Sequence, residues 1–227
     1  NSYSDDDSDY SSSSANSVHS GATSMSEIGR KDDSTNAYEA GKSIGSLMSA
    51  YGLNLDLAPV ADVLSGNSTG IGDRTFGTDA QTVSDMALEV IRGIQEEDVN
   101  AAMKYFPGYG AASSNMSGFP VINSSLDELK KKEFLPYSNA IAQGLDFVMV
   151  GHISVPNVTG DDTPASLSEK MISEVFRKDL GFKGIVMTDY LNDKTIVKNY
   201  GAADAAVKAI QAGADLLLEP DDLEAAY

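Results

Sequence analysis

The chain has 227 residues, enough for one large domain or a small pair, and 41 % of them are hydrophobic, so a substantial core can form. It carries 34 Asp and Glu against 16 Lys and Arg, a formal net charge of −18, and this negative field argues against a nucleic-acid partner. Cysteine is absent, which excludes disulfides and thiolate chemistry. The sequence contains no run of about 18 apolar residues, so we predict no membrane span.

The amino-terminal stretch, residues 1–34, is rich in Ser and Asp and has almost no apolar periodicity. This composition predicts a solvated arm that is poorly ordered or irregular, followed by one folded domain over residues 35–227. The acidic run at residues 5–7 offers oxygen ligands, but such runs are usually solvated, so we predict neither a metal nor a cofactor.

Helix and strand patterns alternate through the rest of the chain. Apolar spacing predicts helices over residues 36–51, 79–97, 125–143, 168–178 and about 203–212. Short apolar runs predict strands over residues 53–59, 100–104, 147–150, 184–187 and 216–218. This alternation with short connections is typical of βαβ units and a parallel sheet.

The predicted fold is therefore α/β and resembles a TIM barrel. A closed barrel has eight strands and about 250 residues, whereas this pattern supplies about five strands. The barrel is expected to be incomplete or to have an irregular amino-terminal part. An open sheet has two unpaired edges, which favours a partner chain unless the arm covers them.

One carboxylate is singled out by its position. Residues 181–193 read GFKGIVMTDYLND, in which a buried strand ends on Thr188 and Asp189. The carboxyl ends of parallel strands carry the chemistry of α/β barrels, so Asp189 is a candidate active-site group. The alternative is that Asp189 only caps the next helix, because strand-to-helix turns often end in Asp.

Seven stretches of the chain, in matching order, resemble family 3 glycoside hydrolases of the β-N-acetylhexosaminidase type. They are GLNLDLAPVADV, GDRTFGTD, KYFPGYG, MVGHIS, TPASLS, LGFKGIVMTDYLND and AIQAGADLLLEP, spread over roughly residues 37–227. The resemblance implies a retaining hydrolase acting on N-acetylglucosamine-type carbohydrate. It also implies that Asp189 is the nucleophile that forms a covalent glycosyl intermediate.

The resemblance further implies a group of sugar-binding residues. Arg74 and Lys104 are expected to bind sugar hydroxyls, since both are long cationic donors on strand-end loops. The alternative for each is a surface charge paired with an acidic neighbour. Tyr105 replaces the family histidine that joins Lys104 in holding the sugar, and a phenol can still donate a hydrogen bond. His152 matches a strand-end histidine that lines or supports the pocket, and we interpret Asp62 as a support for the strand-end loops.

The sequence departs from the family where the general acid/base should be. The family motif Lys-His-Phe-Pro-Gly-His-Gly has both histidines replaced here, by Tyr105 and Tyr109. In the hexosaminidase branch a His, oriented by an Asp two residues earlier, transfers the proton. Ser117 and Asn115 occupy these two positions, and neither can transfer a proton near neutral pH. A positioned acid/base contributes about 10²–10⁴ in rate, so the implied enzyme is slow unless Tyr109 or His152 supplies the proton.

Two functions of different classes stay open at this point. The first is a retaining glycosidase with a weakened or replaced proton donor. The second is a catalytically silent relative that binds sugar or serves as an interaction module. The sequence leaves open the preferred sugar and its linkage. Because the family occurs inside and outside the cytoplasm, location is also open, with an extracellular or cell-envelope site slightly favoured.

Overall fold

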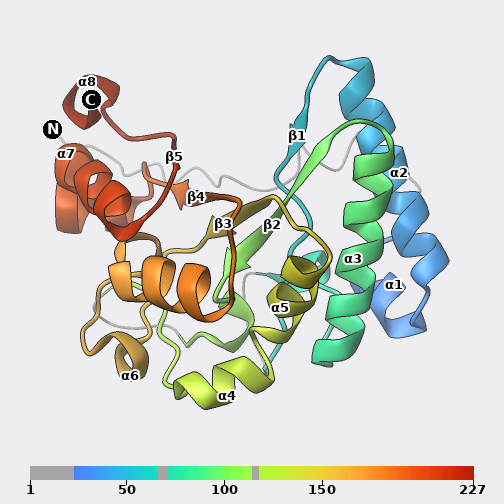
Figure 1. Ribbon diagram of the computed structural model, residues 1–227, viewed down its shortest axis with the longest axis horizontal. Coiled ribbons are helices and arrows are strands. Elements are labelled where there is room, and N and C mark those ends of the chain that lie inside the picture. Colours follow the sequence, from blue (N-terminus) through green and yellow to red (C-terminus); the bar gives the residue numbers. More distant parts are fainter. Residues whose placement is uncertain (1–22, 66–70, 114–117) are drawn as a thin grey trace, which may run out of the picture.

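A computed structural model of the chain describes residues 23–65, 71–113 and 118–227. Five parallel strands form one sheet in the order β1-β2-β3-β4-β5, so neighbours in the sheet are also neighbours in sequence. The strands are β1 Leu55–Asp56, β2 Asn100–Phe106, β3 Phe147–Val150, β4 Ile185–Tyr190 and β5 Leu216–Leu218. The sheet curls into a half-barrel with helices around its outer face (Figure 1). This confirms the predicted α/β fold and the incomplete barrel.

The helices are α1 Met25–Lys31, α2 Ser34–Ala50, α3 Ala80–Glu96, α4 Leu126–Lys131, α5 Leu135–Ala142, α6 Pro156–Thr159, a π-type helix Lys170–Asp179, α7 Lys194–Ala212 and α8 Leu223–Ala226. Helices α1 and α2 precede β1, α8 follows β5, and the other helices lie in the connections between successive strands. Within the described ranges, no helix combines the length and apolarity needed to cross a bilayer.

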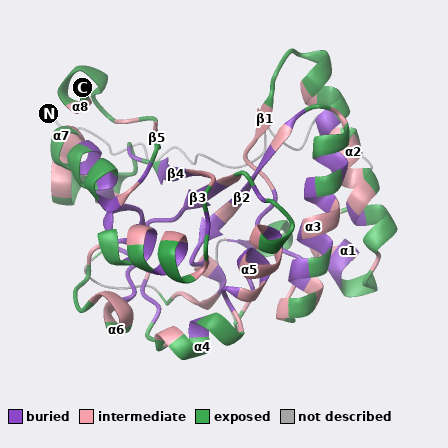
Figure 2. Ribbon diagram, viewed as in Figure 1, coloured by how far each residue is buried: buried purple, intermediate pink, exposed green. Residues whose placement is uncertain are grey.

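Helix α3 shows how the sequence produces this layer. The side chain of Asp79 accepts a hydrogen bond from the Thr82 amide at 2.8 Å and so caps the helix start. Apolar residues then recur every three or four positions and are buried, among them Val83, Val90 and Ile94. Figure 2 shows the result across the molecule, with buried residues on the strands and exposed residues on the outer sides of the helices.

The two faces of the sheet carry separate apolar clusters. Val148 and Val150 of β3 pack into the large core between sheet and helices, where Phe106, Phe134, Tyr137 and Phe176 also lie. Met149 lies in a smaller cluster on the inner face, with Ala102, Tyr105 and Met187. This alternation follows from the two-residue period of a strand. The inner face and the carboxyl ends of the strands position the site described below.

The range expected to be an irregular arm is partly helical, which corrects the prediction for residues 25–31. The side chain of Ser24 caps α1 by accepting a hydrogen bond from the Glu27 amide. Ile28 is buried, and Gly29 lies so close to Phe76 that a Cβ atom would be 1.8 Å from its carbonyl oxygen. These two contacts hold the helix against the domain. Residues 1–22 of the predicted arm lie outside the described residues.

Three further elements differ from their predicted bounds by more than a few residues. The strand expected over residues 53–59 is regular only at Leu55–Asp56 and continues as a single bridge between Val60 and Lys104. The helix expected over residues 125–143 is divided into α4 and α5, and α5 starts afresh with a proline in its first turn. Helix α7 begins nine residues earlier than predicted. Gly201 has non-helical backbone angles (φ 71°, ψ 171°) and interrupts the helix, so the sequence pattern indicated only the part that follows this glycine.

Candidate active site

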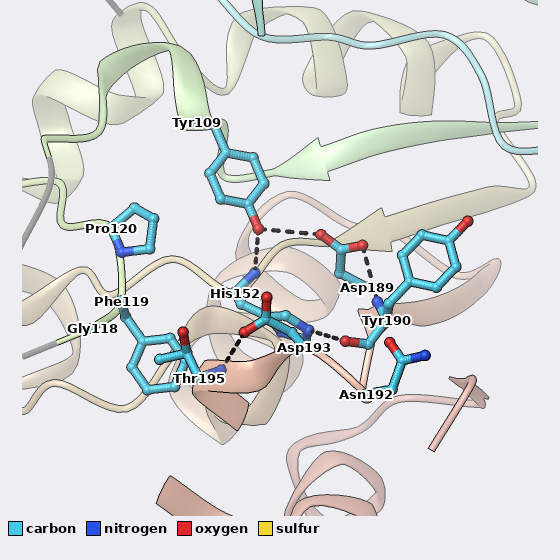
Figure 3. Close-up of a pocket in the computed structure, with 10 residues that line it drawn as sticks. All are labelled: Tyr109, Gly118, Phe119, Pro120, His152, Asp189, Tyr190, Asn192, Asp193 and Thr195. Atoms are coloured by element: carbon cyan, nitrogen blue, oxygen red, sulfur yellow. Dashed lines mark hydrogen bonds between the residues drawn. The ribbon is translucent and has the colours of Figure 1, made fainter. Parts of the chain in front are cut away.

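The carboxyl ends of β2, β3 and β4 face a pocket of about 540 Å³ (Figure 3). A pocket of this size falls within the range of about 300–1,000 Å³ that is usual for small-molecule sites. Its lining residues come from the end of β4 and from the segments that follow β2, β3 and β4: Tyr109, Gly118, Phe119, Pro120, His152, Asp189, Tyr190, Asn192, Asp193 and Thr195. Of these, the sequence predicted a site role for Asp189 and His152 and singled out Tyr109 as a possible proton donor.

Asp189 lies near the end of β4 and is 9 % exposed, at the wall of this pocket. Its Oδ2 atom accepts a hydrogen bond from the Tyr109 hydroxyl at 3.1 Å. Its Oδ1 atom accepts one from the Tyr190 amide at 2.9 Å. The carboxylate is therefore oriented by two donors, one from the connection after β2 and one from β4 itself.

The alternative role of Asp189 as a helix cap is wrong. Helix α7 is capped by Asp193, whose Oδ1 atom accepts from the Thr195 amide at 2.8 Å and the Ile196 amide at 3.4 Å. The loop Leu191–Asn192 separates the two aspartates in sequence. Two carboxylates thus line the pocket. Asp193 caps helix α7, whereas Asp189 takes no part in capping it.

His152 is 5 % exposed, and both of its ring nitrogens have protein partners. Nε2 lies 2.9 Å from the Tyr190 carbonyl oxygen, and Nδ1 lies 2.7 Å from the Ser166 hydroxyl. A carbonyl oxygen only accepts, so Nε2 carries a hydrogen, and in the neutral ring Nδ1 accepts from Ser166. The ring thus links the segment after β3 to the end of β4, and His152 also lines the pocket.

A second group of predicted residues, Arg74, Lys104 and Tyr105, lies beside the pocket and does not line it. A guanidinium nitrogen of Arg74 donates to the Tyr105 hydroxyl at 2.5 Å, and the guanidinium carbon is 5.4 Å from the ring centroid. The Lys104 ammonium is 5.3 Å from the same centroid. Among the residues that the structure describes, neither cation forms an ion pair with a carboxylate, so the surface-pair alternative is not supported.

The two groups meet at a contact between tyrosines. The rings of Tyr105 and Tyr109 pack edge to face, with centroids 5.3 Å apart. Burial lowers the pKa of Lys104, and the neighbouring charge of Arg74 lowers it further, while Asp56, Asp189 and Asp62 act in the opposite direction. The cations and the candidate nucleophile therefore lie within one electrostatic neighbourhood.

Asp62 supports this arrangement from below the surface, as the sequence predicted. It is fully buried, and its Oδ1 atom accepts from the Tyr109 amide at 2.9 Å. The Thr75 hydroxyl donates to its carbonyl oxygen. Burial raises the pKa of Asp62 to about 7, against the opposing effects of the Tyr109 amide and Arg74. In the described part of the chain, its Oδ2 atom has no hydrogen-bond partner.

The positions expected to have lost the general acid/base, Asn115 and Ser117, lie outside the described residues. The other two candidates for this role are engaged elsewhere. Burial, and then the charge of Asp189, raise the pKa of Tyr109 well above its ordinary value, so its hydroxyl is a poor acid. His152 directs its Nε2 hydrogen at a carbonyl oxygen. Over residues 23–65, 71–113 and 118–227, no cluster of three or more His, Cys, Asp or Glu could hold a metal ion.

Residues 17–226 match the family model described as the glycosyl hydrolase family 3 N terminal domain. The chain belongs to glycosyl hydrolase family 3. This confirms the resemblance that the seven sequence stretches indicated.

Two of the relatives that match the chain are beta-hexosaminidases. The chain is 35 % identical over 181 residues to the beta-hexosaminidase LpqI of Mycobacterium tuberculosis, covering 77 % of this chain and 46 % of LpqI. It is 31 % identical over 190 residues to a beta-hexosaminidase of Methylobacillus flagellatus, covering 82 % of this chain and 54 % of that protein. The chain thus spans about half the length of these relatives.

Solved structures of the family have the same fold. A family 3 beta-N-acetylglucosaminidase from Paenibacillus sp. FPU-7 superposes with a TM-score of 0.84 at 36 % identity, over 88 % of this chain and 39 % of that one. NagZ of Neisseria gonorrhoeae, in complex with N-trifluoroacetyl-D-glucosamine, superposes with a TM-score of 0.78 at 29 % identity, over 89 % of this chain and 59 % of NagZ.

Proposed function

We propose that the protein is a retaining glycoside hydrolase of the β-N-acetylhexosaminidase type, with Asp189 as its nucleophile. The observation that carries this proposal is the position of the Asp189 carboxylate and its two hydrogen bonds. It lies at a strand end on the wall of a 540 Å³ pocket, both oxygens are oriented by donors, and helix capping is left to Asp193. The membership in family 3, and relatives that are beta-hexosaminidases, support the same reaction class.

The reaction would proceed in two displacements at the anomeric carbon. In the first, a carboxylate oxygen of Asp189 bonds to this carbon while the bond to the leaving oxygen breaks. The electron pair goes to the leaving oxygen, which then takes up a proton. In the second, water bonds to the same carbon, the ester bond breaks, the carboxylate is regenerated, and the proton of the water is released. Two inversions give net retention.

The second group of residues would bind the sugar. Arg74, Lys104 and Tyr105 provide an exposed guanidinium, a half-buried ammonium and a phenol within one contact group. Hydrogen-bond donors of this kind suit a polyhydroxylated ring. Among the described residues Arg74 and Lys104 have no carboxylate partner, so both can donate hydrogen bonds to a ligand. Tyr105 would hold the Arg74 guanidinium in place, since their hydrogen bond exists without ligand.

Proton transfer to the leaving group is the weak point of this enzyme. Of the described residues, both candidate donors already give their hydrogen to a protein oxygen, Tyr109 to Asp189 and His152 to Tyr190. The first step should therefore depend strongly on how readily the leaving group departs. The same observation favours the second candidate function, a silent relative that binds N-acetylglucosamine-type sugar without turnover.

Aryl N-acetyl-β-glucosaminides with good and poor leaving groups separate these functions. We expect slow release of dinitrophenol, far slower release of phenol, and loss of both in Asp189→Asn. Asp193→Asn is the matched control, because it changes the other carboxylate of the pocket and asparagine caps helices as well as aspartate does. Turnover that survives Asp189→Asn would contradict the proposal, and sugar binding without any turnover would establish the silent relative.

A further inference from the structure

We propose that Tyr109 is a positioning residue for the nucleophile, and that its hydroxyl holds one oxygen of the Asp189 carboxylate in the attacking orientation. This inference rests on the proposed function, because it assigns Tyr109 a role toward the reacting atom of that mechanism. It concerns a position at which the family motif has histidine and this chain has tyrosine.

The direction of the Tyr109 hydroxyl is fixed by its two partners (Figure 3). The backbone N–H of His152 lies 3.0 Å from the phenol oxygen and can only donate to it. The phenol hydrogen is then free to point at Asp189 Oδ2, 3.1 Å away. The hydroxyl accordingly accepts a hydrogen bond from the His152 amide, after β3, and donates one to Asp189, near the end of β4. In the hydrogen bond between these two side chains, Tyr109 is therefore the donor and Asp189 the acceptor.

The second carboxylate oxygen is held independently. The amide of Tyr190 donates to Oδ1 at 2.9 Å, so each oxygen of Asp189 has one donor and keeps another lone pair for the substrate. Two donors on opposite sides of the carboxyl group oppose its rotation. A nucleophile held in a productive orientation reacts faster than one that must first be ordered, which is the basis of positioning in catalysis.

Tyr109 is itself held from several sides. Its amide donates to the buried Asp62, and its ring packs edge to face on Tyr105. On a third side, a Cβ atom on Gly151 would lie 3.1 Å from the ring, so this glycine leaves just enough room for it. The backbone of Tyr109 is thus held by Asp62, and its ring lies against Tyr105 and Gly151, as a positioning residue requires.

The hydroxyl also keeps its hydrogen in the working range of pH. Burial and the charge of Asp189 both raise the pKa of Tyr109 well above its ordinary value. The group therefore serves as a permanent donor to the carboxylate, and it neither supplies nor removes the proton of the reaction.

The test compares Tyr109→Phe with Tyr105→Phe, two substitutions that each remove one hydroxyl from adjoining rings. A fluorinated N-acetylglucosamine-type glycoside with a good leaving group labels the nucleophile, and mass spectrometry follows the rate at saturation. For Tyr109→Phe we expect this rate to fall at least about tenfold, while the Kd for N-acetylglucosamine stays within about twofold. For Tyr105→Phe, a change within the proposed sugar-binding group, we expect a raised Kd, which distinguishes a loss of sugar binding from a loss of positioning. Melting curves show that each variant is folded.

A saturating rate for Tyr109→Phe equal to that of the wild type would overturn the positioning role while leaving Asp189 as nucleophile. Absence of any labelling in the wild type would overturn the proposed function, and the role of Tyr109 with it. A crystal structure of the trapped wild-type intermediate gives a check that needs no variant. The Tyr109 oxygen should remain within about 3.2 Å of an Asp189 oxygen, and a separation too long for a hydrogen bond would overturn the proposal.

Discussion

Asp62 illustrates how a single residue can stabilise the site at a cost to the fold. The side chain is fully buried and anchors Tyr109 through one oxygen, while the other oxygen has no partner within the described residues. An ionised carboxylate in such surroundings is unfavourable, which is why its pKa is raised to about 7. Burial therefore favours the neutral form of the Asp62 side chain, and the effect of this group on stability can be measured.

We predict that Asp62→Asn removes a pH dependence from the free energy of unfolding. The pKa is about 7 in the folded protein and about 3.9 in an unfolded chain, so the folded state binds more protons between these values. The stability from this group is complete below pH 3.9 and is lost as pH rises through 7. Relative to the variant, the free energy of unfolding of the wild type should fall by on the order of 4 kcal/mol between pH 4 and 8. Denaturant unfolding of both proteins across this pH range measures the difference. The prediction is wrong if the free energies of unfolding of the two proteins change with pH in parallel.

For Lys104 we predict opposite effects on binding and on stability. Lys104→Met keeps the length of the side chain but removes the ammonium, whose charged form burial disfavours. Hydrogen bonds to charged groups contribute about 1.5–3 kcal/mol, so the Kd for N-acetylglucosamine should rise about tenfold or more. The melting temperature should stay the same or rise. Lys130→Met, at a surface pair with Asp179, should leave sugar binding unchanged. A variant that binds normally and melts early would make Lys104 structural.

At the scale of elements, α2 and α3 pack closely against each other. Glycines allow it, since a Cβ atom on Gly41 would lie 2.2 Å from the Val90 carbonyl oxygen. A Cβ atom on Gly93 would likewise lie 2.2 Å from the carbonyl oxygen of Tyr38. The neighbouring atoms are backbone, so they cannot rotate away.

We predict that Gly41→Ala destabilises the protein by at least about 2 kcal/mol, because the forced separation of α2 and α3 outweighs the gain in helix propensity. Ser46→Ala, on the exposed side of the same helix, should change stability by only a few tenths of a kcal/mol. Chemical unfolding of the two variants and the wild type gives the comparison. Equal stability of Gly41→Ala and the wild type would show that the two helices can separate freely.

Elements with a clear period were predictable from sequence, and contacts between distant elements were not. The strands Phe147–Val150 and Leu216–Leu218 have the bounds that their apolar runs indicate, and Asp189 lies near its strand end as expected. By contrast, Gly201 obscured the first part of α7, and the short β1 depends on pairing with β2. The hydrogen bond from Tyr109 to Asp189 spans 80 positions in sequence, so only the folded sheet reveals it. The roles proposed for the site residues stay predictions.

At the scale of the whole molecule, the sheet formed by the described residues is a half-barrel whose two edge strands are β1 and β5. Leu53, just before β1, is 54 % exposed, and Leu216 in β5 is 44 % exposed. Large apolar side chains at an unpaired edge are a liability for association with another chain. The expectation that a partner covers these edges stays a prediction. The site proposed here depends on β2, β3 and β4, which are inside the sheet and paired on both sides.

The measurement that tests the central proposal most directly is the position of a covalent label. The full chain is incubated with a fluorinated N-acetylglucosamine-type glycoside, digested, and analysed by mass spectrometry. We predict a mass increase of one sugar on the peptide that contains residues 185–193, with the modification at Asp189 and none at Asp193. A label on any other residue, or a chain that stays unlabelled after prolonged incubation, would contradict the assignment of Asp189 as the nucleophile.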